Sequence, residues 1–324
     1  MNTTRDVIIR DVTLRDGLQL VRAGLPTERK LALARTLLGA GLPQLEIGAI
    51  VRPDRVPTMA DTERVIAGMG AAGALDECWV LVPNLTGTRR AIEAGARNLQ
   101  YVLSVSESHN LANMGCSVRR SLDGLVESLE YAADYDATIQ LGLATAFTCP
   151  FERRTPVDAV RRVIAEGAVG AVHSVVLCDT IGQAVPGEVT ELVGAARAEL
   201  DAAGSSGTGL AFHGHDTWGM GVANTVAAVE AGVGAVDAAL GGLGGCPFAP
   251  GASGNTPLED VLYALRPAWL TQESFHRLVR VGQELTSALG EPARSRAAEG
   301  ARRSPAGHPW ALGDPVAACS PVAL

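Results

Sequence analysis

Short apolar, β-branched runs recur along the chain and alternate with amphipathic stretches. We predict strands at residues 7–12, 44–49, 78–82, 99–105, 138–144, 173–178, 210–213 and 235–240. Between these runs, hydrophobic residues repeat at helical spacing, as in residues 27–38, 62–69 and 186–200, and each of these stretches begins with Thr or Pro, as helices often do. Eight strand–helix repeats predict an α/β fold of the (β/α)8 type, a TIM barrel.

The alternative fold is an open, doubly wound sheet, which requires a glycine-rich phosphate turn after an early strand. Neither the dinucleotide-binding glycine pattern nor a P-loop follows any of the first strands. The glycine-rich segment, residues 241–246, instead follows the last predicted strand, where a barrel carries an active-site loop. The pattern therefore favours the barrel.

We interpret residues 1–297 as a TIM-barrel catalytic domain with terminal helices, and the periodic pattern is lost from Gly290 onward. Residues 298–324 are rich in Ala, Arg, Pro and Ser, and we expect them to form a flexible C-terminal tail. The chain of 324 residues is longer than a typical domain. Barrels of roughly 250 residues nevertheless form single units, so we expect one domain with a short C-terminal extension.

Composition and charge narrow the range of partners. The net charge is −8 at pH 7 and basic residues do not cluster, which argues against a nucleic-acid partner. Apolar runs are all shorter than the roughly 18 residues of a membrane span, which argues against a membrane protein. Six cysteines without a CxxC pair and without a preceding signal peptide predict a reduced, cytoplasmic setting. A small-molecule substrate fits these features best.

The chain has a single lysine, Lys30, between acidic and basic neighbours at a predicted helix start. We expect this lysine to be solvated. Schiff-base aldolases and pyridoxal enzymes need a lysine that is desolvated inside the pocket. This interpretation argues against covalent catalysis by an amine.

Polar residues are dense at the carboxyl ends of the predicted strands, where barrel enzymes place their catalytic groups. His213-Gly214-His215 is the sharpest signal, because alternate residues of a strand point the same way and the two imidazoles project together. Asp16 ends the first strand, which lies near the seventh in a closed barrel, and is the expected third ligand. Imidazole with oxygen ligands suits Mg²⁺, Mn²⁺ or another divalent ion. The alternative is that the two histidines are a chance pair and do not form a metal site.

Glu46 lies among apolar neighbours, and a buried carboxylate requires a partner. Arg15, at the adjacent strand end, either pairs with Glu46 structurally or stabilises a developing oxyanion. Cys246 lies on the glycine-rich loop before a proline. It is either a proton donor on a mobile loop or a small residue in a turn.

Three motifs together resemble a known family. They are the run from Asp11 to Gln19 (DVTLRDGLQ), the run from His213 to Gly219 (HGHDTWG) and the glycine-rich loop from Gly241 to Asn255 (GGLGGCPFAPGASGN). They are similar to 3-hydroxy-3-methylglutaryl-CoA lyase, within the metal-dependent lyase and aldolase barrels. The resemblance covers about residues 5 to 290, and the Cys-containing glycine loop is its most specific element.

The resemblance implies a divalent metal, Mg²⁺ or Mn²⁺, held by Asp16, His213, His215 and Asn255, with Glu46 supporting the site. It implies Arg15 on the thioester oxygen and Cys246 as the thiol that protonates the leaving carbanion. The expected catalytic residues are thus Arg15, Asp16, Glu46, His213 and Cys246, and the expected substrate contacts are Arg15, Gln19, Asn84, Asp179, Gly244 and Gly245. A homodimer is expected from the family.

The activity implied is a retro-Claisen cleavage of a 3-hydroxy-3-methylglutaryl-CoA-like thioester to acetyl-CoA and a keto acid. Substrate-facing positions differ, since Gly48-Ala49-Ile50 stands where the lyases have Thr-Ser-Phe. The alternative is therefore a Claisen or aldol condensing enzyme, or an aldolase, that acts on a different substrate, a hydroxy acid without CoA included. A third interpretation is a non-catalytic barrel subunit. Every key residue of the motifs is present, which argues against this interpretation.

Overall fold

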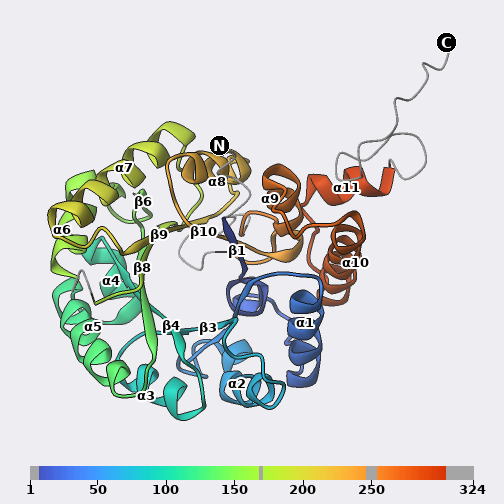
Figure 1. The fold of residues 1–324 in the computed structure, drawn as a ribbon, viewed down its shortest axis with the longest axis horizontal. Coiled ribbons are helices and arrows are strands. Elements are labelled where there is room, and N and C mark those ends of the chain that lie inside the picture. The colour runs from blue at the N-terminus through green and yellow to red at the C-terminus, as the bar shows by residue number, and fades with distance from the viewer. Residues whose placement is uncertain (1–6, 168–170, 246–253, 304–324) are drawn as a thin grey trace.

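The structure is a computed structural model that describes residues 7–167, 171–245 and 254–303. Its strands form a closed barrel in the order β1-β10-β9-β8-β5-β4-β3-β2, and neighbouring strands are parallel (Figure 1). They are β1 (Ile8–Asp11), β2 (Gln44–Ala49), β3 (Cys78–Val82), β4 (Asn98–Ser104), β5 (Thr138–Ala144), β8 (Ser174–Asp179), β9 (Gly209–Gly214) and β10 (Ala235–Ala238). The predicted TIM barrel is confirmed, and each predicted strand overlaps an observed one.

Helices surround the barrel in chain order (Figure 1). They are α1 (Thr27–Gly39), α2 (Thr62–Ala71), α3 (Leu85–Glu93), α4 (Glu107–Met114), α5 (Val118–Ala133), α6 (Val157–Glu166), α7 (Pro186–Ala202), α8 (Gly221–Glu230), α9 (Leu258–Leu265), α10 (Gln272–Leu289) and α11 (Arg296–Arg303). A small antiparallel hairpin of β6 (Thr148–Cys149) and β7 (Arg153–Arg154) follows β5 and was not expected from the sequence. Short helical turns cover Thr13–Gly17, Pro57–Met59 and Leu240–Gly242.

The strands are buried on both faces, which explains why their sequences are almost continuously apolar. Apolar side chains of the strands belong to one buried cluster with apolar side chains of the helices, and the strands also carry buried polar groups. Gln140 donates to Gln100 on the neighbouring strand, and Arg10 is 1% exposed. Buried polar side chains of this kind require polar partners, and the partner of Arg10 belongs to the candidate site.

The C-terminal helices extend the barrel on one side (Figure 1). Helix α11 is fixed by Asp260, whose carboxylate accepts the backbone N–H groups of Arg296 and Ala297. Ala298 and Ala301 of this helix are buried. The predicted boundary before residue 298 therefore falls inside a packed helix that continues to Arg303, and the rest of the predicted tail, 304–324, lies outside the described residues.

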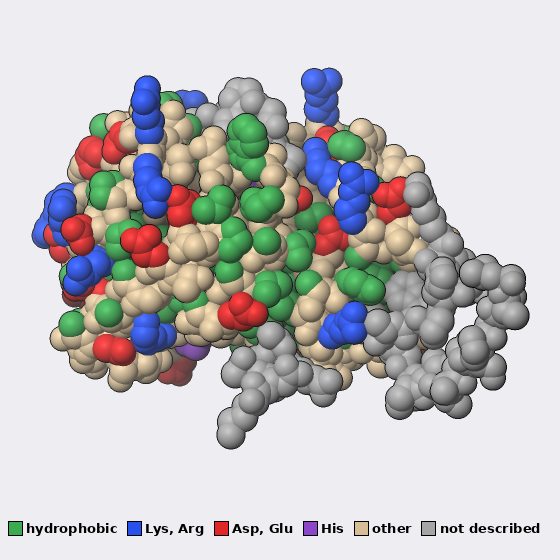
Figure 2. All heavy atoms as spheres, turned by 90° about the horizontal axis from the view of Figure 1, so that it is seen from above, with side chains coloured by type: hydrophobic (Ala, Val, Ile, Leu, Met, Phe, Trp, Pro, Cys, Tyr) green, Lys and Arg blue, Asp and Glu red, His purple; other side chains and the backbone are tan. Residues whose placement is uncertain are grey.

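Figure 2 shows the side of the barrel that carries α7, α8 and α9, where acidic, basic and apolar side chains are interspersed. Within the described part of the chain, no helix is long and apolar enough to cross a membrane. The described cysteines, Cys78, Cys116, Cys149 and Cys178, are free thiols.

Candidate metal centre and active site

The turn after β1 places two charged side chains at the mouth of the barrel. Residues Thr13–Gly17 form a single π-helical turn, and both Arg15 and Asp16 within it are buried. The turn is tied down because the Thr13 hydroxyl donates to Asp11 at 2.7 Å and accepts the N–H of Leu240 at 2.8 Å. This network joins the turn after β1 to the turn that follows the last strand, so the Thr13–Gly17 turn has little freedom to move.

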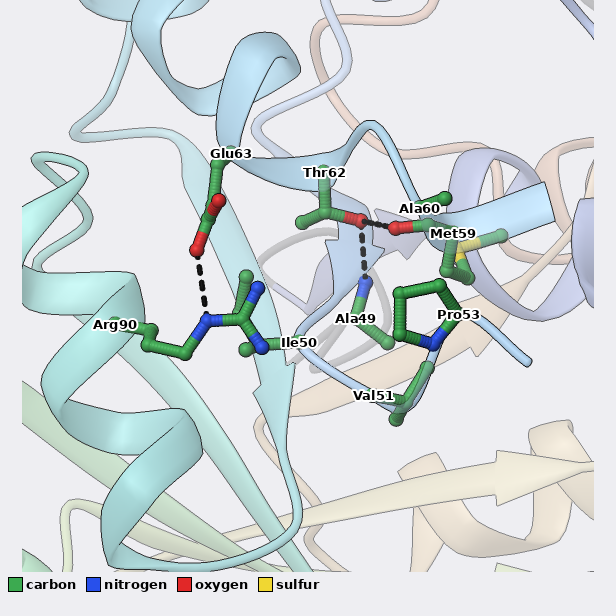
Figure 3. Close-up of a pocket in the computed structure, with 9 residues that line it drawn as sticks. All are labelled: Ala49, Ile50, Val51, Pro53, Met59, Ala60, Thr62, Glu63 and Arg90. Carbon is green, nitrogen blue, oxygen red and sulfur yellow. Dashed lines mark hydrogen bonds and ion pairs between the residues drawn. The ribbon is translucent and has the colours of Figure 1, made fainter. Parts of the chain in front are cut away.

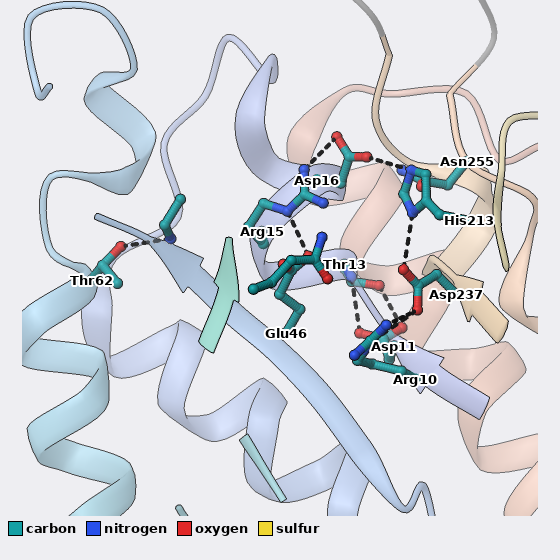
Figure 4. A network of polar contacts seen from close by, with 12 residues as sticks. Arg10, Asp11, Thr13, Arg15, Asp16, Glu46, Thr62, His213, Asp237 and Asn255 are labelled. Atoms are coloured by element: carbon teal, nitrogen blue, oxygen red, sulfur yellow. Dashed lines mark hydrogen bonds and ion pairs between the residues drawn. The ribbon is translucent and has the colours of Figure 1, made fainter. Parts of the chain in front are cut away.

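Two histidines, His213 on β9 and His215 directly after this strand, converge on the carboxylate of Asp16, and Figure 4 shows the contact of His213. The Nε2 atom of His213 lies 3.2 Å from Asp16 Oδ2, and the Nε2 atom of His215 lies 3.4 Å from the same oxygen. The candidate ligand atoms of these residues lie within 4.8 Å of one another, and the three side chains are buried. The expected projection of both imidazoles into one site is therefore observed.

Asn255 completes the cluster from the segment before α9. It forms a β-bridge with His215, and its Nδ2 donates to the carbonyl of Leu243 at 2.8 Å. Its Oδ1 is buried and accepts no hydrogen bond from any residue that the structure describes. A buried amide oxygen without a partner needs a donor or a cation, and Figure 4 shows the Asn255 side chain next to His213. This donor set of two nitrogens and two oxygens fits a divalent ion such as Mg²⁺ or Mn²⁺.

Arg15 and Glu46 form the expected pair (Figure 4). Arg15 Nε donates to Glu46 Oε2 at 2.6 Å, and Glu46 is fully buried. One terminal nitrogen of Arg15 also lies 3.4 Å from Asp16 Oδ1. The guanidinium is thus fixed between the supporting carboxylate and the histidine cluster, where it is able to serve an oxyanion as well as Glu46.

Asp237 and Arg10 belong to the same network but were not found by sequence reasoning. Asp237 Oδ2 lies 3.1 Å from His213 Nδ1, and Asp237 Oδ1 accepts a hydrogen bond of 2.8 Å from Arg10 Nε. Both residues lie within apolar strand segments. A carboxylate amid apolar neighbours is the signal that identified Glu46, and the same signal was available for Asp237.

The electrostatics of the cluster favour a bound cation. Burial would raise the pKa of Asp16, but Arg15 and hydrogen bonds to His213 and His215 hold it well below its usual range. Burial opposes protonation of His213, yet the hydrogen bonds to Asp16 and Asp237 raise its pKa to about 9. Burial also raises the pKa of Glu46, which Arg15 offsets only in part. The carboxylates thus favour a cation beside Asp16 Oδ2, the oxygen that both Nε2 atoms contact.

A family model described as HMGL-like matches residues 6–284. The chain belongs to the HMGL-like family. It is 34% identical over 300 residues to a 3-hydroxy-3-isohexenylglutaryl-CoA/hydroxy-methylglutaryl-CoA lyase of Pseudomonas aeruginosa, with 92% of this chain and 98% of that protein aligned. It is 34% identical over 292 residues to the hydroxymethylglutaryl-CoA lyase of Pseudomonas mevalonii, with 90% and 95% aligned.

A solved structure of an HMG-CoA lyase from Acinetobacter baumannii, in complex with coenzyme A and 3-methylmalate, superposes on this HMGL-like chain with a TM-score of 0.84. The two are 34% identical, and the match covers 95% of this chain and 98% of that one. The resemblance inferred from the three motifs is therefore confirmed.

The remaining predicted site residues lie at the carboxyl end of the barrel and differ in their burial and in their hydrogen bonds. Gln19 is half-buried and its carbonyl accepts the Thr58 hydroxyl. Asn84 is exposed and caps α3 by accepting the Gly87 N–H at 3.0 Å. Asp179 is fully buried, and its carboxylate accepts the N–H groups that follow β8 at Gln183 and Ala184. For Asn84 and Asp179 these contacts describe structural roles.

The glycine-rich loop packs directly against the cluster. Gly244 has a φ of +115°, and a Cβ there would come under 3.0 Å from Asn255 Nδ2 and to 3.2 Å from the Asp16 carbonyl oxygen. Glycine is therefore required at this position for both conformation and space. Gly245 follows it and is half-buried. Cys246 lies outside the described residues.

The prediction that Lys30 is solvated is wrong. Its side chain is 3% exposed, and Nζ lies 2.5 Å from Asp61 Oδ1 and 2.6 Å from the carbonyl oxygen of Thr58. The partner Asp61 lies far along the chain, at the start of α2, so the local sequence did not reveal the burial. Lys30 is nevertheless held in an ion pair between α1 and α2, away from the histidine cluster, and is not a free amine in the pocket.

A small hollow lies between the end of β2, α2 and α3 (Figure 3). There the Thr62 hydroxyl donates to the carbonyl of Met59 at 2.8 Å and accepts the Ala49 N–H at 3.3 Å. A Cβ at Gly48 would lie 2.6 Å from this hydroxyl. Gly48 therefore accommodates Thr62, which gives a packing reason for glycine at a position where the chain departs from the lyase pattern.

Proposed function

We propose that this chain is a divalent-metal-dependent carbon–carbon lyase that cleaves a 3-hydroxy-3-methylglutaryl-CoA-like thioester to acetyl-CoA and a keto acid. The observation that carries the proposal is the convergence of His213 Nε2 and His215 Nε2 on Asp16 Oδ2 beside the buried Arg15. The names of the relatives and the coenzyme A in one related structure support a CoA thioester as substrate.

Asp16, His213, His215 and Asn255 would hold the metal, and we propose Mg²⁺ or Mn²⁺ because two of the four ligands are hard oxygen donors. When bound, a divalent cation lowers the pKa of a coordinated hydroxyl and polarises an adjacent carbonyl. The charge of the site fits such an ion. Asp16, Glu46 and Asp237 supply three carboxylates, and the two guanidinium groups of Arg10 and Arg15 balance only two of them.

In a retro-Claisen cleavage, each of these residues has a separate role. Asp16, whose Oδ1 is contacted by neither histidine, accepts the proton of the tertiary hydroxyl. The hydroxyl oxygen becomes a ketone as the adjacent carbon–carbon bond breaks, and the bonding electrons move onto the thioester as an enolate. Arg15, oriented by Glu46, stabilises the enolate oxygen. We assign to Cys246 the proton that the enolate carbon receives to give acetyl-CoA.

Incubation with 3-hydroxy-3-methylglutaryl-CoA tests the proposal. We expect acetyl-CoA and acetoacetate in equal amounts with Mg²⁺ or Mn²⁺, loss of turnover in EDTA, and recovery when metal is restored. His213→Ala and Cys246→Ala should each lower kcat by about 100-fold or more, since the first removes a metal ligand and the second removes a general acid, a group that contributes about 10²–10⁴-fold. Turnover that persists after removal of the metal, or none with metal bound, would contradict the proposal.

A comparison of acyl groups then defines the substrate. The relative from Pseudomonas aeruginosa is named for both an isohexenylglutaryl and a methylglutaryl thioester. We propose to compare these two thioesters with the free hydroxy acids, because Gly48-Ala49-Ile50 differs from the lyase pattern. A homodimer and a cytoplasmic setting remain part of the proposal, and sedimentation and cell fractionation test them.

A further inference from the structure

Arg10 is a buried cation inside the barrel that the proposed reaction does not use. It lies on β1 and is 1% exposed. Its guanidinium carbon lies 5.3 Å from the ring centroid of Trp79 on β3. A guanidinium in such a position is costly unless it is paired, so its partner is informative.

The partner is a single carboxylate oxygen on β10. Arg10 Nε and Arg10 Nη2 each lie 2.8 Å from Asp237 Oδ1. Because both nitrogens contact the same oxygen, Asp237 Oδ2 is left for His213, whose Nδ1 lies 3.1 Å away. The opposite ring nitrogen, His213 Nε2, lies 3.2 Å from Asp16 Oδ2 (Figure 4). A continuous chain of contacts thus joins Arg10 to the candidate metal ligands.

The orientation of each group in this chain determines the next. When Asp237 Oδ2 accepts a hydrogen bond from the Nδ1–H of His213, the lone pair of the imidazole is placed on Nε2, beside Asp16 Oδ2. A carboxylate behind a metal-binding histidine fixes the tautomer and the ring orientation in this way. Asp237 is able to do so only while its own carboxylate is held in position, and Arg10 holds it through the hydrogen bond from Nε and the ion pair with Nη2.

We infer that Arg10 is a positioning residue for the metal site: it orients Asp237, which presents His213 Nε2 to the divalent cation. The inference rests on the proposed function, since it concerns the same metal. Its direct consequence is a change in metal affinity, measured without substrate.

The test is the dissociation constant for Mn²⁺ alone, measured by calorimetry on the full chain. We expect Arg10→Met to weaken binding by about 10-fold, the lower end of the range for partners of a metal ligand, because Arg10 acts through Asp237. Arg10→Lys keeps the charge but replaces the planar guanidinium with a single ammonium, so we expect the Mn²⁺ affinity to fall several-fold. The resonance of the His213 Nδ1 proton should shift or broaden in both variants, which a general loss of stability would not produce.

A double-mutant cycle shows whether Arg10 acts through Asp237. In an Asp237→Asn background, Arg10→Met should change the Mn²⁺ affinity by less than about 2-fold. Lys30→Met is the matched control, because it breaks another buried ion pair outside the cluster and should lower stability without changing the affinity.

The outcomes separate the two proposals. Wild-type affinity in Arg10→Met or Arg10→Lys would overturn the inference, as would an equal loss in both backgrounds of the cycle. If Arg10→Met does not fold, Arg10→Lys and Asp237→Asn still decide the question. If the wild-type chain itself does not bind Mn²⁺, the proposed function fails.

Discussion

Gly244→Ala tests whether the glycine-rich loop shapes the metal site. The new Cβ would come under 3.0 Å from Asn255 Nδ2, whereas ordinary contacts begin at 3.4 Å. The Asn255 amide must therefore move by about 0.5–1 Å, and a misplacement of 1 Å at a catalytic site costs about 100-fold in rate. The positive φ of Gly244 adds backbone strain of about 1–3 kcal/mol.

Gly115→Ala separates strain from the clash. Gly115 ends α4 with a φ of +72°, and a Cβ there would meet nothing within 4 Å. Both variants should therefore unfold at lower temperature, but only Gly244→Ala should lose kcat/KM, by about 100-fold, and Mn²⁺ affinity. Calorimetric titration with Mn²⁺ and the coupled assay for acetyl-CoA provide these values. Equal activity in the two variants would refute the geometry assigned to Asn255.

Three further predictions concern charge. Asp16→Asn should weaken Mn²⁺ binding by more than about 100-fold in calorimetric titration, because a ligand matters more than its neighbours, which contribute about 10–100-fold. Lys30→Met should destabilise the fold by about 2–3 kcal/mol and lower Tm by about 5–10 °C in thermal unfolding by circular dichroism, since Asp61 keeps the Thr27 hydroxyl as a partner. Burial raises the pKa of Glu259 from 4.5 to about 8, so the stability from its neutral form is complete below pH 4.5 and lost as the pH rises through about 8. Glu259→Gln should remove this fall in urea titrations across that range, and an unchanged slope would contradict the assignment.

The fold was predictable from the sequence because its signals are local. Apolar β-branched runs of strand length alternate with helical periodicity, and a parallel barrel buries its strands on both faces. The pairing of His213 with His215 was predictable for the same reason, because residues two apart on a strand share a face.

What the sequence did not reveal depends on contacts between distant segments. Arg10 and Asp237 are 227 residues apart and meet only because β1 and β10 close the barrel. The burial of Lys30 likewise requires Asp61, which lies 31 residues away on another helix. The packing of α11 depends on Asp260, since half of the residues of this short helix are charged.

The central claim is that an enolate forms at a divalent-metal site and is protonated within the active site. Cleavage of 3-hydroxy-3-methylglutaryl-CoA in D₂O, followed by mass spectrometry of the products, tests it most directly. The account predicts acetyl-CoA that carries a single deuterium in its methyl group, formed only when Mg²⁺ or Mn²⁺ is present. Acetyl-CoA formed without a divalent ion or without deuterium, or a metal-loaded chain that leaves the thioester intact, would contradict the account.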